Sequence, residues 1–334
     1  MEKMNYDEFK EYVAANIRDF LPEKEKKNVI TLNKTRKVNQ TMDCLTIKRP
    51  GSKIIPNIYL NSLYEQYKDG KGIDEILREI TDTWTESISN EICDLLQYEN
   101  MTPELIKERV YYQLINKEKN RSLLEQVPHR DFCDLAVIYR YLFNDLCDGI
   151  VSAVVTNYCM SDGITEQDLF TYAEANTERL FGTKVQTMED MLIGKLECTK
   201  QDFSDPSRHK YEISQIDAQI STIRESSANN PFQLYVASNK KGINGATVLL
   251  NTEVMEKLSN QLSGDLLIIP SSIHECIICG AAAIDVDEAY KMLHEVNETV
   301  LEEADYLSDT VYYYDRETGE IMDAYEALSK MQAV

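Results

Sequence analysis

Residues 266–279 read LLIIPSSIHECIIC, and this stretch gives the clearest indication of the fold. Two apolar runs lie on either side of a short polar turn, which is typical of two neighbouring β-strands. The turn holds a cluster of side chains that could take part in catalysis or binding, namely Ser271, Ser272, His274 and Glu275. The stretch therefore predicts a strand pair that presents a polar turn at one end.

The flanking residues extend this pair into repeated strand–strand–helix units. Asp285 and Glu288 mark the start of a helix after the pair, and Thr252 is expected to cap the helix before it, which runs to Leu262. Three further runs predict strands in this part of the chain, FQLYVASN, ATVLLNT and TVYYYDRETGEIMDAY, the last as two strands around a turn at residues 315–319.

The same order occurs earlier in the chain. CDLAVIYRYLF and GIVSAVVTNYCM predict a strand pair, RVYYQLIN predicts a strand before it, and Thr165 with Asp168 forms the capping box of the following helix. Two helices end alike, with Asn176 and Asn297 at inward positions. A buried amide needs hydrogen-bond partners, so each asparagine is expected to fasten its helix to nearby backbone, with a ligand contact as the alternative.

The N-terminal part has a different order of elements. Asn5 and Glu8 predict the start of a helix to Phe20, three short strands follow, and then helices begin near Asn61 and after Gly72. The whole chain is therefore predicted to be α+β: an N-terminal helix–three-strand–helix layer followed by repeated strand–strand–helix units. The expected divisions are an α+β domain at 1–100, a middle unit at 101–200, a polar linker at 201–231 and a C-terminal unit at 232–334.

The linker contains one amphipathic helix, expected at residues 211–225. Its apolar stripe consists of Ile213, Ile216, Ile220 and Ile223. Such a stripe ordinarily packs against the same chain, and an arm that binds a partner protein is the alternative.

Composition limits the classes of function. The net charge is −22, which disfavours binding to nucleic acids and to anionic membranes. It is compatible with a basic partner or with mimicry of nucleic-acid charge. The eight cysteines fall mostly in apolar runs, and neither a signal peptide nor a membrane-spanning run is recognised. We therefore expect a cytoplasmic protein with reduced cysteines.

The polar turn offers one candidate catalytic site. His274 beside Glu275 could act as a general base for Ser271 or Ser272, as in a hydrolase. No G-x-S-x-G motif surrounds either serine, and Ile278 stands where a zincin motif would need its second histidine. A polar turn with local hydrogen bonds is the alternative.

Metal and nucleotide chemistry receive less support. Cys276 and Cys279 lie in a predicted strand without a second cysteine pair at suitable spacing, so a structural role is expected. His129 and His294 could meet His274 in a metal site, whereas His209 is expected to be exposed in the linker. Phosphate-binding glycine motifs are absent, and no cofactor is expected.

Several motifs together resemble a known family. IPSSIHE, LSDTVYYYDRETGEI, VPHRDFCDLAV and AEANTERL are similar to motifs of an uncharacterised Firmicutes family with a domain of unknown function, and more distantly to the YtpQ-like family. In these families the positions of Cys276 and Cys279 are usually aliphatic or proline. The resemblance implies no activity.

The sequence thus favours a binding or adaptor protein for a protein, a peptide or a small ligand. A hydrolase that uses His274, Glu275 and a serine is one alternative, and an acidic decoy of a nucleic-acid-binding protein is the other. The oligomeric state is not predicted.

Overall fold

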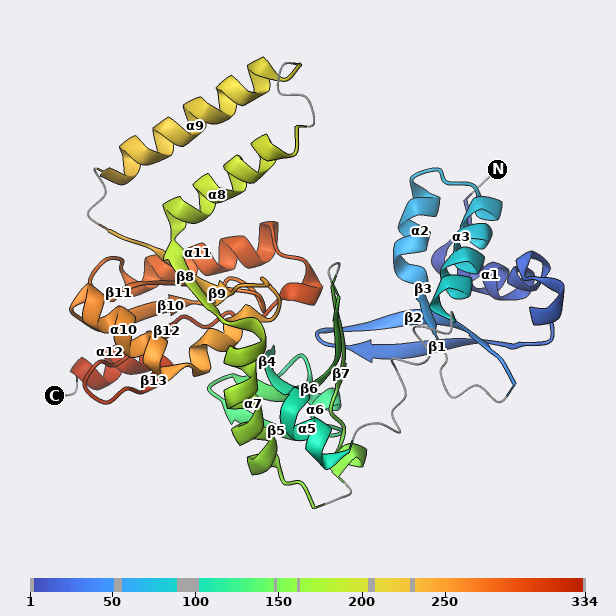
Figure 1. The fold of residues 1–334 in the computed structure, drawn as a ribbon, viewed down its shortest axis with the longest axis horizontal. Coiled ribbons are helices and arrows are strands. Elements are labelled where there is room, and N and C mark those ends of the chain that lie inside the picture. Colours follow the sequence, from blue (N-terminus) through green and yellow to red (C-terminus); the bar gives the residue numbers. More distant parts are fainter. Residues whose placement is uncertain are drawn as a thin grey trace. The chain divides into compact units, whose positions relative to one another are not determined.

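The computed structural model describes residues 3–50, 56–88, 102–146, 149–160, 163–203, 208–228 and 232–332 (Figure 1). The chain divides into two compact units, residues 1–106 with 142–153 and residues 107–141 with 154–334. Helices and antiparallel sheets contribute to the fold, which confirms the α+β class. The four divisions expected from the sequence stay predictions.

The first unit contains the predicted helix–three-strand–helix layer. Its elements are α1 (Tyr6–Phe20), η1 (Glu23–Glu25), β1 (Val29–Lys37), β2 (Gln40–Lys48), β3 (Asn57–Tyr59), α2 (Leu60–Lys68) and α3 (Ile73–Ser87). The strands pair in the order β1-β2-β3, and Asn5 and Glu8 form the expected capping box of α1. Trp84 is fully buried and donates its Nε1–H to the carbonyl of Ile47 at 3.0 Å, so it anchors α3 to β2.

A second sheet has the order β4-β6-β5, with β7 paired to β6. The strands and the short helices around them are α5 (Pro103–Arg109), β4 (Val110–Asn116), α6 (Arg121–Leu124), β5 (His129–Phe132), β6 (Leu135–Leu146), β7 (Gly149–Val154) and η3 (Asn157–Met160). Helix α7 (Glu166–Phe181) packs against β4, and the capping box of Thr165 and Asp168 begins it as expected.

The third sheet belongs to the second unit and has six antiparallel strands in the order β13-β12-β10-β11-β9-β8. Its strands are β8 (Thr183–Thr187), β9 (Tyr235–Asn239), β10 (Leu266–Ile269), β11 (Cys276–Gly280), β12 (Tyr312–Tyr314) and β13 (Ile321–Asp323). The strand pair predicted from residues 266–279 is therefore the centre of this sheet. The helices with it are η4 (Gly245–Leu250), α10 (Thr252–Leu262), α11 (Val286–Thr299), η5 (Glu303–Asp305) and α12 (Ala324–Gln332).

The two asparagines near helix ends, Asn176 and Asn297, make the backbone contacts expected of them. Asn176 is buried and donates from Nδ2 to the carbonyls of Lys107 and Val110, both at 2.9 Å, which fastens α7 to the start of β4. Asn297 donates from Nδ2 to the carbonyl of Ser308 at 2.9 Å. In both places the amide connects a helix to the chain beside it.

Two local predictions in the C-terminal part were wrong. ATVLLNT was expected to be a strand, but residues 245–250 form the 3-10 helix η4, in which Ala246, Thr247, Val248 and Leu249 are all buried. Complete burial of consecutive residues is not the alternation of a strand on a sheet surface, and a short apolar run does not distinguish the two. The cap of α10 is Asn251, whose side chain accepts from the Val254 N–H, and not Thr252.

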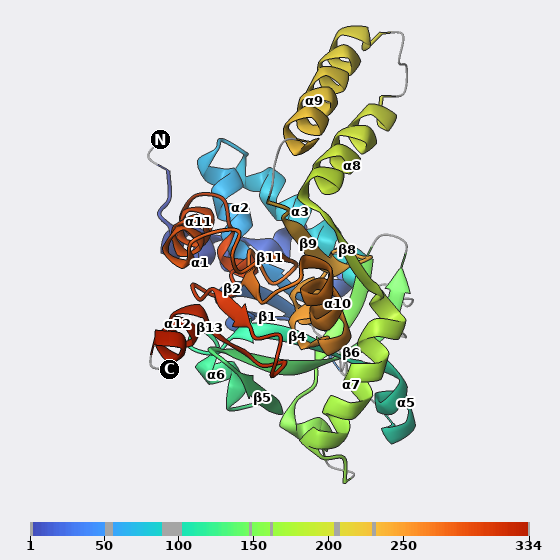
Figure 2. The same cartoon turned by 90° about the vertical axis from the view of Figure 1, so that its left-hand side faces the viewer.

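The isoleucine stripe packs against a neighbouring helix. Helices α8 (Met188–Gln201) and α9 (Lys210–Ala228) lie side by side and extend away from β8 and β9 (Figures 1 and 2). Ile216 and Ile220 are buried, and Lys200 of α8 binds Asp217 of α9 at 2.6 Å. Among the described residues, no helix has the length and apolar character that crossing a membrane requires.

Candidate functional site

The polar turn between β10 and β11 places His274 between two partners. Its Nδ1 accepts a hydrogen bond from the backbone N–H of Asn244 at 3.1 Å, and its Nε2 lies 3.2 Å from Asp305 Oδ1. Because a backbone N–H can only donate, Nδ1 carries no proton in this arrangement and Nε2–H donates to Asp305. Both ring nitrogens are thus engaged by groups outside the turn.

The serines of the turn bind its own backbone. Ser271 Oγ donates to the carbonyl of Glu275 at 3.1 Å, and Ser272 Oγ accepts from the N–H of His274 at 3.0 Å. These bonds keep the turn tight between the two strands. The structure brings the four predicted residues together, but it directs the imidazole towards Asn244 and Asp305 instead of towards a serine.

The turn also holds the segment that precedes and forms η4. Ser238 of β9 donates from Oγ to the carbonyl of His274 at 2.7 Å, and the Ala246 N–H donates to the carbonyl of Ile273 at 3.2 Å. Asn244 has a left-handed backbone conformation, with φ 54° and ψ 29°. A Cβ atom at Gly245 would lie 2.4 Å from the carbonyl oxygen of His274, so only glycine permits this close approach.

On its other side this segment forms a wall of a pocket of about 300 Å³ within the second unit. The name wall segment is used below for residues 244–250. The pocket lies among α7, the start of β8, the end of β9, the wall segment and the start of α10. It is lined by Tyr112, Glu174, Thr177, Glu178, Gly182, Thr183, Ser238, Asn239, Gly245, Thr247, Val248, Leu250, Asn251, Thr252 and Glu253.

The charges that line the pocket are of one sign. Glu174, Glu178 and Glu253 are carboxylates, and the described lining residues include neither lysine nor arginine. Glu178 accepts hydrogen bonds from the backbone N–H of Thr183 at 3.0 and 3.1 Å, which fixes its position at the end of α7. Burial, with a further contribution from Glu174, raises the pKa of Tyr112, so this phenol stays protonated and can donate.

One lysine lies at the rim. The Lys240 side chain runs beside Gly182, where its Cδ, Cε and Nζ would each lie 3.2 Å from a Cβ on that glycine. Lys240 is exposed, and its backbone N–H donates to the carbonyl of Gly182 at 2.9 Å. The chain therefore already places one ammonium group next to the acidic lining.

The other histidines have separate surroundings. His129 contacts the carbonyl of Val127 at 3.0 Å through Nδ1, and His294 lies 3.8 Å from Asp309. His209 stacks on Phe203 with ring centroids 4.5 Å apart. Across the described part of the chain, no group of three or more His, Cys, Asp and Glu side chains is arranged to hold a metal ion.

Cys276 and Cys279 are buried in β11, and burial is the main cause that raises the pKa of both thiols, that of Cys279 to about 11. A raised pKa keeps a thiol protonated and unreactive at neutral pH. Their surroundings are those of small apolar side chains in a sheet.

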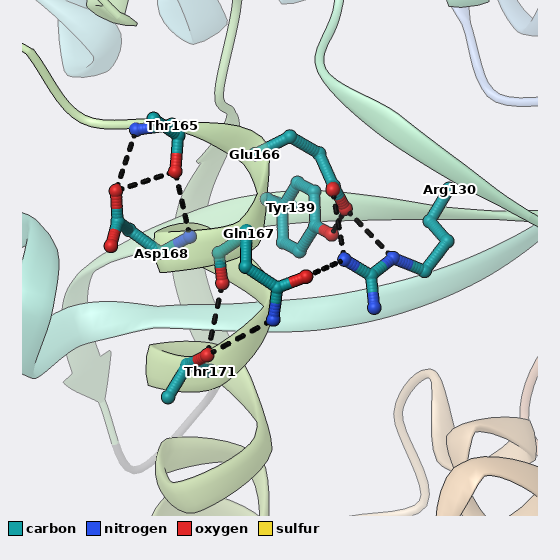
Figure 3. Close-up of polar contacts among 7 residues, drawn as sticks. All are labelled: Arg130, Tyr139, Thr165, Glu166, Gln167, Asp168 and Thr171. Carbon is teal, nitrogen blue, oxygen red and sulfur yellow. Dashed lines mark hydrogen bonds and ion pairs between the residues drawn. The ribbon is translucent and has the colours of Figure 1, made fainter.

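A polar network that the sequence interpretation missed lies where α7 meets the second sheet (Figure 3). Arg130 of β5 forms a two-pronged ion pair with Glu166, at 3.2 Å from Nε and 2.9 Å from Nη2, and the hydroxyl of Tyr139 donates to the same carboxylate. Arg130 also lies 3.9 Å from the ring centre of Phe170. Every charge here has a partner within the chain, so the network positions α7 and with it the acidic side of the pocket.

Two shallower hollows, of about 510 and 600 Å³, share Leu124, Glu125 and His129. The first is lined by charges of both signs, including Lys117 and Glu118, and therefore indicates no preferred ligand charge. In the second, Glu166 is already paired with Arg130, so the pocket beside the wall segment has the more definite chemistry. Sequence reasoning missed it because its residues come from four separated stretches, although the helix start predicted at Thr252 marked one of them.

Comparison with known proteins identifies a family for this chain. The model of a family described as a family of unknown function, DUF5688, matches residues 6–316. No curated protein and no solved structure matches the chain.

Proposed function

The chain belongs to the family of unknown function DUF5688. From the pocket beside the wall segment, we propose that it is a binding protein for basic peptides or proteins. The pocket takes the ammonium or guanidinium group of a lysine or arginine side chain. The observation that carries the proposal is the single sign of the lining charges, Glu174, Glu178 and Glu253, in a pocket of about 300 Å³.

The hydrogen-bonding groups of the lining suit a cation. An ammonium has three donors and a guanidinium has five, and neither has an acceptor. The carboxylates of Glu174 and Glu253 are acceptors of the kind required. The volume is at the lower end for small-molecule sites, which matches one long side chain better than a nucleotide or a cofactor.

The charge of the whole chain supports the same partner. At −22 the chain attracts basic segments over distances of about one Debye length, ~8 Å at physiological salt, and so raises their rate of association. The Lys240 side chain already places an ammonium beside Gly182, one of the lining residues. It also competes with an incoming cation, so replacing it is expected to strengthen binding.

Fluorescence anisotropy with a labelled peptide that contains lysines separated by glycine and serine tests the proposal, against a matched peptide with glutamine at each lysine. Wild-type protein is expected to bind the lysine peptide in preference. Glu174→Gln with Glu253→Gln is expected to weaken binding about tenfold, since each exposed charge pair contributes up to ~1 kcal/mol. Lys240→Gln is expected to tighten it.

The control is a variant with the same net charge, Glu298→Gln with Glu317→Gln, which removes two exposed carboxylates outside the pocket. If this control weakens binding as much as the pocket variant, the attraction is general and the pocket is not the site. Equal binding of the lysine and glutamine peptides would reject the proposal.

A hydrolase remains the second candidate, and the contact between His274 and Asp305 favours it. An acid that orients a histidine is one part of a nucleophilic triad. Engaging a serine would require His274 to release the Asn244 N–H. Labelling with a fluorophosphonate probe tests this candidate: covalent modification that is lost on Ser271→Ala or Ser272→Ala would support it, and the absence of labelling would exclude a serine activated for this chemistry.

A further inference from the structure

His274 holds the wall segment by a hydrogen bond, so its protonation state can affect the pocket that this segment lines. Its Nδ1 accepts from the Asn244 N–H at 3.1 Å, and Asn244 is the residue from which the wall segment begins. Gly245 and Ser238, which contact the carbonyl side of the same histidine, line the pocket. One side chain thus supports the wall from behind, without being part of the lining.

We propose that His274 is a pH-dependent latch: when its imidazole gains a proton, the wall segment is released and the pocket loses affinity for its cation. The second half of this statement rests on the function proposed above, whereas the first half concerns the protein without ligand. No residue of the latch needs to touch the ligand.

At Nδ1 the imidazole nitrogen meets the backbone N–H of Asn244, which can only donate. A neutral imidazole with its proton on Nε2 offers a lone pair to Asn244, whereas an imidazolium has a donor at both nitrogens. Protonation therefore sets two N–H donors against each other at 3.1 Å, a hydrogen-bond distance. The Asn244 amide then loses its acceptor, and the left-handed conformation of Asn244 loses a bond that holds it.

Several charged groups lie around the His274 imidazole. Asp305 faces Nε2 at 3.2 Å and accepts from the ring whether it is neutral or charged, so it orients the imidazole in both states. Other charged groups on the turn and on the elements next to it are Glu275, Lys240, Lys241, Glu302 and Glu303.

The closed wall requires the neutral ring, so closure is complete while the ring is neutral and is lost as the pH falls and the ring gains a proton. Lysine ammonium groups and most glutamate carboxylates keep their charge across neutral and mildly acidic pH. A loss of binding between about pH 7.5 and 5.5 that His274→Asn abolishes therefore has its source in this histidine.

Amide hydrogen exchange on the ligand-free protein tests the latch itself. The protection factors of the Asn244 and Ala246 amides are expected to fall about fivefold or more from pH 7.5 to 5.5, the equivalent of one lost hydrogen bond. The Tyr313 amide in β12 serves as the internal reference. Protection that stays constant or rises as the pH falls would mean that the attraction of Asp305 prevails, and it would overturn the proposal.

Two variants sharpen the test. His274→Asn keeps an acceptor at the position of Nδ1 and cannot titrate, so protection is expected to stay high at both pH values. His274→Ala removes the acceptor, so protection is expected to be low at both. His294→Asn on α11 is the matched control and is expected to keep the wild-type pH dependence; if it abolishes the dependence instead, the latch is refuted.

Binding of N-acetyl-lysine methylamide at the same two pH values tests the link to the pocket. Wild type is expected to bind about fivefold more weakly at pH 5.5, and His274→Asn is expected to bind equally at both. If exchange shows the latch but this probe binds at neither pH, the proposed function fails while the latch stands. If the probe binds with the same pH dependence in His274→Asn, the latch fails while the function stands.

Discussion

Replacing Gly245 with alanine tests how closely the wall segment is held against the histidine turn. A Cβ atom there would lie 2.2 Å from Ser238 Oγ, 2.4 Å from the carbonyl oxygen of His274 and 2.8 Å from the backbone nitrogen of Asn239. The serine hydroxyl can rotate away, but the other two atoms belong to the backbone of β9 and of the turn. The wall must therefore move outwards by about 1 Å to reach an ordinary contact of ~3.5 Å.

The magnitude follows from what that shift breaks. Overpacking alone costs about 1–3 kcal/mol. Rotation of the Ser238 hydroxyl would break its bond to the His274 carbonyl, and the shift of the wall would lengthen the bond from the Ala246 N–H to the Ile273 carbonyl, at about 1 kcal/mol each. Gly245→Ala is therefore expected to lower the free energy of unfolding of the second unit by about 3–5 kcal/mol.

Urea unfolding followed by far-ultraviolet circular dichroism measures this loss, and the fluorescence of Trp84, which is the only tryptophan and lies in the first unit, is recorded in parallel. Gly194→Ala in the middle of α8 is the matched control. Nothing lies within 4 Å of a Cβ there, so helix propensity alone should stabilise this variant by up to ~1 kcal/mol. A Gly245→Ala protein within about 0.5 kcal/mol of wild type would refute the close approach.

Two further predictions concern pH. The guanidinium of Arg49, at 2.7 Å, holds the pKa of Glu25 below its usual range, so this pair stabilises the first unit above the ordinary glutamate pKa and loses its effect as the pH falls. Glu25→Gln should therefore lower the free energy of unfolding by about 1–2 kcal/mol at neutral pH and leave it unchanged in acid. Urea unfolding followed by the fluorescence of Trp84 measures both values. Burial, together with Glu166, raises the pKa of Tyr139, so the folded state favours the neutral phenol and loses stability as the pH rises above about 10. Other buried tyrosines, such as Tyr112 and Tyr312, are raised in the same way, so in an ultraviolet titration Tyr139→Phe should reduce the component that ionises only with alkaline unfolding by one tyrosine. If Tyr139→Phe instead removed one tyrosine from the reversible component near pH 10, the buried contact would be contradicted.

Signals between residues close in the chain predicted most of the elements. The capping boxes at Asn5 and Thr165 depend on a residue three positions away, and both are present in the structure. The strand pair of residues 266–279 was equally local, because its apolar runs and its turn are contiguous. Such features need no knowledge of the remaining chain.

What could not be predicted depends on distant partners. The conformation of residues 244–250 is set by two groups of His274, its carbonyl oxygen and its Nδ1, and His274 lies 30 positions from Asn244 in the chain. Without that contact, the apolar run by itself indicated a strand. The histidine turn was recognised as a polar cluster, but its partner Asp305 lies on η5, 31 positions onward. The pocket draws its acids from α7 and α10, which sequence periodicity cannot bring together.

Amide chemical-shift mapping with a single cationic probe tests the central claim most directly. N-acetyl-lysine methylamide would be titrated into labelled protein at neutral pH, with N-acetyl-norleucine methylamide as the neutral probe of similar shape. We predict saturable shifts at Thr183, Asn239 and Thr252 with the lysine probe, much smaller shifts with norleucine, and loss of the effect in Glu174→Gln with Glu253→Gln. Shifts that are absent, that lie outside the pocket, or that are equal for the two probes would contradict it.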